Sequence, residues 1–351
     1  MSNPPSTPRL AMIGCGYWGP NLLRNLRSLP GAKLVTVADA AEARRMWVGK
    51  QYPGLETRAD AEAVLEDPNI DAVVIATPSA THGRLVKDAL LAGKDVFVEK
   101  PLSLSGAEAN ELASLAVATG RVLMVGHTFL YNAAVRDLKR RIDGGELGNV
   151  YYLYSQRLNL GIVRSDVNVA WNLAPHDVSI GCYLLGQEPD EVSACGVTAL
   201  QASVEDVVFL TMSFPSGARM NVHVSWLDPR KVRRLTVVGD KKMIVYDDVA
   251  DEKITIYDKG ITKEERVPVE QPTDFARFKM VTRAGDVTIP NLTVPEPLTE
   301  ECKHFIDCVT HRKRPISDGF EGARVSRVLE AVDKSLAARG APVKVAPPLA
   351  Q

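Results

Sequence analysis

Two residues of this 351-residue chain combine a reactive side chain with a position that could expose it to a ligand. Lys100 follows the expected strand Asp95–Glu99 and precedes a proline, so we expect it in extended backbone at the end of that strand. His176 follows Pro175 at the amino end of an expected helix, residues 173–185, where the helix dipole disfavours an imidazolium ion. A partly desolvated lysine and a neutral histidine are both suited to proton transfer, and a surface lysine and a structural histidine are the alternatives.

A glycine-rich turn near the amino terminus indicates a dinucleotide site, beside which these two residues would act. An apolar strand beginning at Arg9 runs directly into Gly14, Gly16 and Gly19, which have the spacing of the dinucleotide-binding fingerprint. The first glycine permits a tight turn, the second lets the backbone approach a pyrophosphate, and the third lets the next helix pack on the strand. Tyr17 and Trp18 lie in the same turn and are candidate cofactor contacts.

The cofactor is predicted from the second strand, residues 33–40. It ends at Asp39, where a carboxylate can accept hydrogen bonds from both ribose hydroxyls of an adenosine. The same charge would repel the 2′-phosphate of NADP, so NAD is the expected cofactor. Arg44 and Arg45 follow within two turns and could bind a 2′-phosphate, which leaves NADP as the alternative. No metal is expected.

Strands and helices alternate through residues 1–126, and the strands are almost continuously apolar. That pattern predicts an α/β fold whose N-terminal Rossmann domain is a doubly wound parallel sheet of about six strands. Ligands bind at the carboxyl ends of such strands. The candidate cofactor contacts at those ends are Thr77, Pro78, His82, Glu99 and Lys100.

Residues 127–297 have a different pattern, that of an α+β domain with a large, mostly antiparallel sheet. In one strand Met220, Val222 and Val224 alternate with polar residues, which predicts one buried and one open face. We expect the open face to form the interface of a homodimer or homotetramer. Two closing helices within residues 298–338 are expected to pack back on the first domain.

Composition argues against a nucleic-acid-binding protein and against a membrane protein. The net charge is −1 and the longest basic run is Arg312–Arg314, so a nucleic-acid partner is not expected. The sequence has no apolar stretch of membrane-spanning length, and its five cysteines include no Cys-x-x-Cys pair. The chain is therefore expected to be cytoplasmic.

A polar segment, residues 157–171, leads from a strand into the helix that carries His176. Arg157, Asn159 and Arg164 lie in it and are candidate substrate contacts. The two arginines could bind a carboxylate or a phosphate of the substrate. A solvated loop with ordinary charges is the alternative.

Together these motifs resemble the Gfo/Idh/MocA family of NAD(P)-dependent sugar and cyclitol dehydrogenases. The residues that carry the resemblance are Gly14, Gly16, Gly19, Thr77, Pro78, His82, Glu99, Lys100, Pro101, Ala174, Pro175, His176 and Asp177. The resemblance implies that Lys100 and His176 serve proton transfer. The family's usual aspartate, four residues before the histidine, is replaced here by Asn172, which can orient a hydroxyl but cannot ionise. The general base is then expected to be His176, Lys100 or both.

The resemblance implies a dehydrogenase, or in reverse a ketoreductase, that acts on a secondary hydroxyl of a sugar. The polar segment resembles members that act on the C3 hydroxyl of nucleotide-linked and amino sugars. An inositol or sugar-phosphate dehydrogenase is one alternative. An NAD-retaining glycosidase or epimerase and a non-catalytic NAD-binding sensor are two others.

Overall fold

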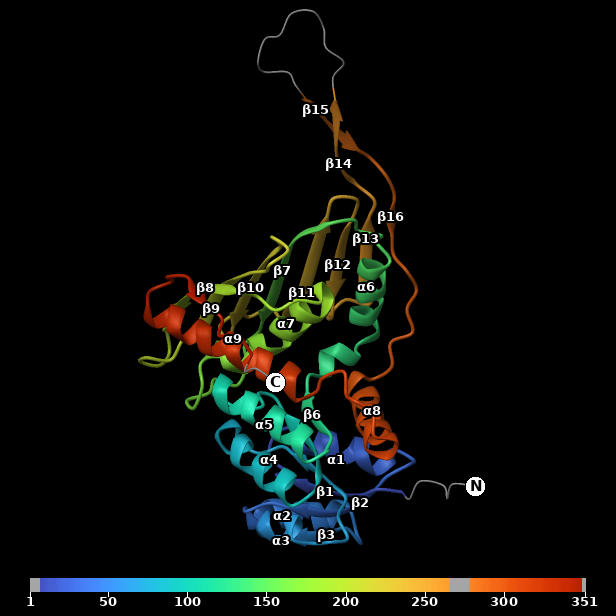
Figure 1. Ribbon diagram of the computed structural model, residues 1–351, viewed down its shortest axis with the longest axis vertical. Helices are drawn as coiled ribbons and strands as arrows, with labels where there is room; N and C mark the ends of the chain where they lie inside the picture. The colour runs from blue at the N-terminus through green and yellow to red at the C-terminus, as the bar shows by residue number, and fades with distance from the viewer. Residues whose placement is uncertain (1–6, 266–277, 349–351) are drawn as a thin grey trace, which may run out of the picture.

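The structure, a computed structural model, describes residues 7–265 and 278–348. Two sheets follow one another along its long axis, and a β-hairpin projects beyond the second (Figure 1). The first sheet has six parallel strands in the order β3-β2-β1-β4-β5-β6. These are β1 (Arg9–Ile13), β2 (Lys33–Ala38), β3 (Glu56–Arg58), β4 (Ala72–Ile75), β5 (Asp95–Glu99) and β6 (Leu123–Gly126).

This strand order is that of a Rossmann fold, in which the direction of winding reverses between β1 and β4. Every residue of β4 is buried, as expected for a central parallel strand covered on both faces. The loops after β1, β4 and β5 therefore lie side by side at one edge. The accompanying helices are α1 (Gly19–Ser28), α2 (Glu42–Gln51), α3 (Glu62–Leu65), the short η1 (Ser79–Thr81), α4 (His82–Leu91) and α5 (Gly106–Ala118).

The second sheet has nine strands in the order β16-β13-β12-β11-β7-β10-β9-β8-β17. All neighbours are antiparallel except β7 and β10, which are parallel. The strands are β7 (Val150–Leu158), β8 (Glu191–Val197), β9 (Val207–Ser213), β10 (Arg219–Ser225), β11 (Val232–Gly239), β12 (Met243–Asp247), β13 (Ile254–Tyr257), β16 (Val287–Thr288) and β17 (Val343–Lys344). The two-domain fold class predicted from the sequence is confirmed.

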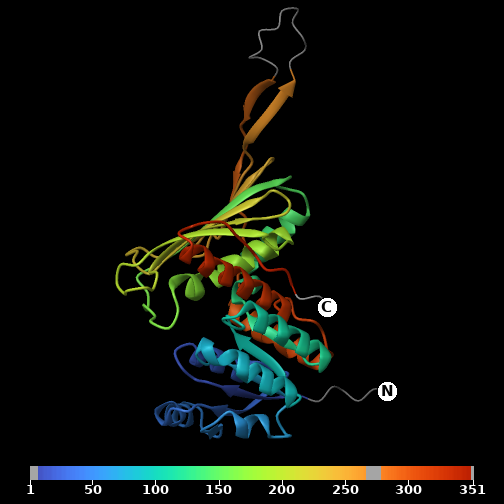
Figure 2. The same ribbon diagram turned by 60° about the vertical axis from the view of Figure 1, so that its left-hand side comes forward.

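One face of this sheet is buried and the other is open. In β10, Met220, Val222 and Val224 are buried while Asn221 is exposed, so the predicted alternation is confirmed. The helix α7 (Val169–Leu185) packs on the buried face and α6 (Ala133–Asp143) lies beside β12. Figure 2 shows the helices gathered on that side of the sheet, with the opposite face free of described helices.

The charged run that begins at Lys263 indicates a solvated strand edge, but the hairpin of β14 (Gly260–Glu265) and β15 (Phe278–Arg283) is not expected from the sequence. It extends away from the body of the molecule in both views (Figures 1 and 2). Arg283 ties its base to the sheet by donating to the side chain of Asp258 at 2.5 Å. A hairpin that projects from the core lacks the apolar periodicity from which the other strands were inferred.

The closing helices connect the two domains. The helix α8 (Pro297–His311) packs against α1 and against η2 (Thr128–Tyr131), whereas α9 (Gly319–Ala337) packs against α5, α7 and β8. Ser326 of α9 donates to the carbonyl of Ser103 at 2.8 Å. One continuous apolar cluster includes residues of both sheets, from Leu10 in β1 to Ile256 in β13. This shared core holds the two sheets in a fixed relation across the space between them. Among the described helices, none is long and apolar enough to cross a membrane.

Candidate active site

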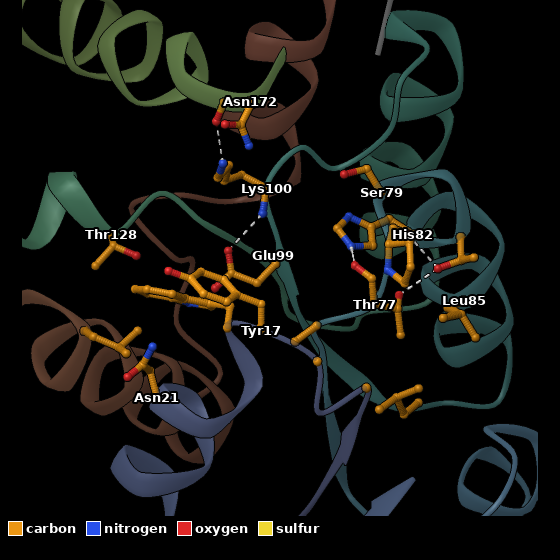
Figure 3. Close-up of a pocket in the computed structure, with 18 of the residues that line it drawn as sticks. Tyr17, Asn21, Thr77, Ser79, His82, Leu85, Glu99, Lys100, Thr128 and Asn172 are labelled. Atoms are coloured by element: carbon orange, nitrogen blue, oxygen red, sulfur yellow. Dashed lines mark hydrogen bonds between the residues drawn. The ribbon is translucent and has the colours of Figure 1, made fainter. Parts of the chain in front are cut away.

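A cavity of about 1180 Å³ lies between the two domains, at the carboxyl ends of β1, β4 and β5 (Figure 3). The predicted residues that line it are Gly14, Gly16, Tyr17, Trp18, Asp39, Arg44, Thr77, Pro78, His82, Glu99, Lys100, Arg157, Arg164, Asn172 and His176. Gly19 and Asn159 lie outside the lining. Asn159 is just beyond β7, where its backbone N–H donates to the carbonyl of Ser225 at 3.2 Å.

The glycine-rich turn has the geometry of a pyrophosphate cradle. Gly14 has a φ of +89°, and a Cβ there would lie 2.6 Å from the carbonyl oxygen of Ala76. Gly16 would place a Cβ in open space, so its backbone is accessible from the cavity. At Gly19 a Cβ would lie 3.0 Å from the Met12 side chain, which explains why α1 can pack so close to β1. The turn and the amino end of α1 therefore suit a dinucleotide.

Asp39 lies at the end of β2 beside this turn. Its two carboxylate oxygens accept the backbone N–H groups of Cys15 at 2.7 Å and Ala41 at 2.9 Å, and each keeps acceptor capacity for a ribose hydroxyl. Arg44 lines the same part of the cavity. Arg45 instead donates to the carbonyls of Asp39 and Ala40, at 2.7 and 2.8 Å, and does not line the cavity.

His82 joins the loops that follow β4 and β5. Its Nδ1 lies 2.7 Å from the carbonyl oxygen of Pro101 and its Nε2 lies 2.9 Å from that of Thr77 (Figure 3). Burial lowers the pKa of His82, and a neutral imidazole can donate to only one of the two carbonyls at a time. This side chain fixes the two loops relative to each other while it forms part of the cavity wall.

Lys100 crosses the cavity from β5 toward α7. Its ammonium donates to the backbone carbonyl of Asn172 at 2.8 Å, and its own backbone N–H donates to Glu99 at 3.3 Å (Figure 3). Burial lowers the pKa of Lys100, against the attraction of the Glu99 carboxylate, and the charge of Arg157 lowers it further. Burial also raises the pKa of Glu99, against the attraction of Lys100. Lys100 therefore gives up its proton more readily than a lysine in water does.

The predicted place of His176 in its helix is wrong. The helix α7 begins at Val169, and Asn168 caps it by accepting the N–H of Trp171 at 3.2 Å. Pro175 lies inside the helix, so His176 is well beyond the first turn, where the dipole no longer affects a pKa appreciably. Burial is the main reason that the pKa of His176 lies well below its usual value, and the charge of Lys100 adds to the effect.

Asn172 contributes two separate groups. Its backbone carbonyl accepts from Lys100, as described above, whereas its side-chain oxygen accepts the indole N–H of Trp226 at 3.1 Å. The side-chain carbonyl is therefore engaged by a buried tryptophan, and the amide nitrogen stays available as a donor toward the cavity. Asn172 lies one turn before His176 on the same side of α7.

The candidate substrate arginines differ in their surroundings. Arg157 is buried and forms a bidentate ion pair with Asp177, with contacts of 2.7 and 3.3 Å. Arg164 pairs with Asp166 in the more exposed loop, at 2.5 and 2.8 Å. Both arginines are among the residues that line the cavity. The charge of Arg157 is largely neutralised by its partner.

Several residues of the site were missed in the sequence, namely Thr128, Phe129, Arg233 and Asp248. Thr128 and Phe129 follow β6 at the same sheet edge as the predicted loops, and this position could have identified them. Thr128 donates at 2.6 Å to Glu301, a buried carboxyl whose pKa burial raises well above its usual value. Arg233 lies within β11, and no local sequence signal distinguishes it from other strand residues.

Comparison with known proteins assigns the family. Residues 8–127 match the model of the GFO/IDH/MocA oxidoreductase family with an NAD-binding Rossmann fold, and residues 135–245 match the family's C-terminal domain. The chain belongs to the Gfo/Idh/MocA family. It is an oxidoreductase of the class that acts on CH–OH groups with a nicotinamide cofactor, and the resemblance inferred from its motifs is confirmed.

The chain is similar to three known proteins, two of them above 30% identity. It is 32% identical over 321 residues to the scyllo-inositol 2-dehydrogenase (NAD+) of Bacillus subtilis, with 88% of each chain covered. A crystal structure of a Magnetospirillum magnetotacticum protein is 34% identical, has a TM-score of 0.77 and covers 93% of this chain and 99% of its own. The UDP-N-acetylglucosamine 3-dehydrogenase of Acidithiobacillus ferrooxidans shares the fold at 24% identity and a TM-score of 0.76, over 94% of this chain and 98% of its own.

Proposed function

We propose that this protein is an NAD-dependent dehydrogenase that oxidises a secondary hydroxyl of a sugar or cyclitol ring, or reduces the matching ketone. The observation that carries the proposal is the position of Lys100. Its ammonium lies in the same cavity as the glycine cradle and 2.8 Å from the carbonyl of Asn172, one turn before His176. A group able to exchange a proton thus lies beside the cofactor pocket, as oxidation of an alcohol requires.

Oxidation of a secondary alcohol removes a hydride from the carbinol carbon and a proton from its oxygen. When bound between Gly14, Gly16 and Asp39, NAD would supply the hydride acceptor. We assign the proton to Lys100, because its lowered pKa makes the neutral amine available. The resulting ammonium can then stabilise the new carbonyl oxygen. His176 remains neutral, because its pKa is far lower, and orients the hydroxyl by a hydrogen bond.

NAD is the proposed cofactor, since the Asp39 carboxylate, next to the end of β2, would repel a 2′-phosphate. Arg44 lines the same part of the cavity and is the residue that would favour NADP. Arg45 is a weaker candidate for that role, because it donates to two backbone carbonyls.

The substrate class is proposed from the relatives and from the polar segment before α7. A cyclitol is the first candidate, because the relative at 32% identity is named a scyllo-inositol 2-dehydrogenase. The C3 hydroxyl of a nucleotide-linked or amino sugar is the second candidate. It rests on residues 157–171, since the likeness to the UDP-N-acetylglucosamine enzyme concerns the fold alone.

The test is NADH formation by the purified protein with scyllo-inositol, myo-inositol, UDP-N-acetylglucosamine and hexose phosphates. We expect NADH to accumulate with at least one of them, and Lys100→Ala to abolish the reaction. Product formation without net NADH would indicate an epimerase or hydrolase that retains its cofactor. Absence of hydride transfer even in a single turnover would favour an NAD-binding sensor.

A further inference from the structure

Two arginines face each other across neighbouring strands in the wall of the cavity. Arg157 of β7 and Arg233 of β11 are direct partners in the antiparallel register, so their side chains leave the sheet on the same face. Both line the cavity. Like charges placed directly opposite each other are destabilising unless anions compensate them. The pair therefore requires negative charge from its surroundings.

The described residues compensate the two arginines unequally. Arg157 has the bidentate pair with Asp177, in which both side chains are almost fully buried. Arg233 has a single contact of 3.4 Å from Nη1 to Asp248. Asp248 is itself shared, because its other oxygen accepts the hydroxyl of Tyr246 at 2.9 Å. The negative charge at Arg233 is thus both more distant and divided.

One edge of the Arg233 guanidinium has no protein acceptor. Its Nε is buried and lacks a hydrogen-bond partner in the part of the chain that the structure describes, and its Nη2 makes no hydrogen bond to those residues either. These two nitrogens form the side of the guanidinium fork that binds two oxygens at once. Asp248 occupies the opposite side, at Nη1, and so does not block it. A buried donor without an acceptor is costly, so an oxygen acceptor that reached this edge of the guanidinium would be stabilising.

The Arg233 guanidinium and His176 share an aromatic neighbour, Phe129. The ring of Phe129 has the Arg157 guanidinium 4.4 Å and the Arg233 guanidinium 5.9 Å from its centre. The His176 ring meets the same phenyl group edge-on, with 4.9 Å between centres. One aromatic ring thus positions both arginines and the histidine. A ring-sized substrate at His176 could reach Arg233 with a substituent.

We propose that Arg233 binds an acidic group of the substrate, so that the substrate is an anionic sugar or cyclitol bearing a carboxylate or a phosphate. This inference rests on the proposed dehydrogenase function and narrows it. Two parallel hydrogen bonds from Nε and Nη2 fit two oxygens of either group, whereas a neutral hydroxyl offers one oxygen. The acidic group would also bring a negative charge closer to Arg233 than Asp248, whose contact is 3.4 Å long.

The experiment measures binding and needs no turnover. Protein saturated with NADH is titrated by calorimetry with D-glucuronate, glucose-6-phosphate and D-glucose, and with myo-inositol phosphate and myo-inositol. We expect at least one acidic probe to bind about 10-fold or more tightly than its neutral counterpart. The glucuronate and phosphate arms separate the two acidic groups. Equal or weaker binding of every acidic probe would overturn the proposal.

Variants of Arg233 test whether this residue binds the acidic group. Arg233→Gln should weaken the acidic probe about 10- to 100-fold and leave the neutral one unchanged. Arg233→Lys, which keeps the charge but not the fork, should recover part of the loss. The matched control is Arg234→Gln, because Arg234 is the next residue of β11 and pairs with Asp247 outside the cavity. NADH affinity reports that each variant is folded.

The outcomes separate this inference from the proposed function. An acidic probe that binds through Arg233 but is never oxidised would leave the anion site standing and contradict the dehydrogenase. If Arg233→Gln oxidised a neutral substrate at an undiminished rate, the dehydrogenase function would stand and the anion site would be contradicted. Unchanged binding of the acidic probe by Arg233→Gln would also overturn the role of Arg233.

Discussion

The ammonium of Lys100 donates to the backbone carbonyl of Asn172 at 2.8 Å, so the link between the two domains across the cavity passes through main chain, not through the asparagine side chain. The side-chain oxygen of Asn172 is engaged by Trp226. A substitution at residue 172 therefore leaves the acceptor of Lys100 in place. This relationship decides what Asn172 variants should do.

Asn172→Ala should reduce kcat/KM by less than about 10-fold, because it removes one neutral hydrogen bond, from Trp226, worth ~1 kcal/mol. His176→Ala should cost more, since it removes the group that orients the hydroxyl in the reacting complex. Steady-state kinetics with the substrate found in the NADH assay provide the measurement. A loss of 100-fold or more in Asn172→Ala would mean that the amide side chain acts directly on the substrate.

Lys100→Ala should lower turnover about 100-fold or more while NADH binding is nearly unchanged, because the amine acts on the substrate oxygen and not on the pyrophosphate. Single-turnover kinetics and NADH titration measure the two effects separately. Lys87→Ala is the control, since Lys87 is exposed on α4 outside the cavity. If Lys100→Ala kept more than about a tenth of the wild-type rate, proton transfer would have to be reassigned to another group.

The rate of oxidation should rise with pH as Lys100 loses its proton, with a midpoint below the usual pKa of lysine. The Glu99 carboxylate raises the pKa of Lys100, so Glu99→Gln should move this limb of the pH–rate profile to lower pH. Asn172→Asp should move it to higher pH, because the added carboxylate favours the ammonium form. Shifts of the same sign in both variants would contradict the assignment of the limb to Lys100.

Calorimetry should give a higher affinity for NAD than for NADP, because the Asp39 carboxylate repels a 2′-phosphate. Asp39→Ser should narrow the difference. The hydroxyl can still accept the N–H of Cys15 or Ala41, which limits the damage to the turn. Equal or better binding of NADP by the unaltered protein would show that Arg44 outweighs Asp39, and Arg44→Ala would then restore the preference for NAD.

We expect a second copy of the chain to cover the open face of the second sheet. Tyr152 and Tyr154 stack there with 6.3 Å between ring centres, and Phe209 and His223 stack at 4.2 Å, on the neighbouring strands β7, β10 and β9. Light scattering should therefore give a molecular mass of at least twice the 38.2 kDa of one chain. Phe209→Glu should lower the mass without loss of NADH binding, whereas Met46→Glu, an exposed change on α2, should not. A monomeric wild-type protein would refute the expectation.

Features of the site that depend on local backbone geometry could be predicted from the sequence alone. The spacing of Gly14, Gly16 and Gly19 and the acid at Asp39 follow from what one turn and two adjacent strands need in order to hold a dinucleotide. The position of Lys100 at a strand end was likewise readable, because a parallel sheet brings its carboxyl ends to one edge. Six strands were expected in the first domain and six are present.

The expected start of α7, at residue 173, is wrong, because proline is common in the first turn of a helix and Pro175 therefore suggests one. The actual first turn is set by Asn168, and the helix continues through Pro175 within a buried environment. Tertiary packing stabilises those turns in spite of the local preference. As a result, burial and not the helix dipole keeps His176 neutral.

The sequence by itself determined the two-domain fold and the glycine-rich turn after β1, and it singled out Lys100 and His176, which the structure brings to one cavity. Only the tertiary structure decided that Arg157 is neutralised by Asp177 and that Arg233 faces the same cavity with an open edge. Strand register across β7 and β11 and the packing of α7 bring these residues together. Such contacts between distant segments leave no periodic signal in the chain, because each arginine looks locally like any other polar residue of a strand.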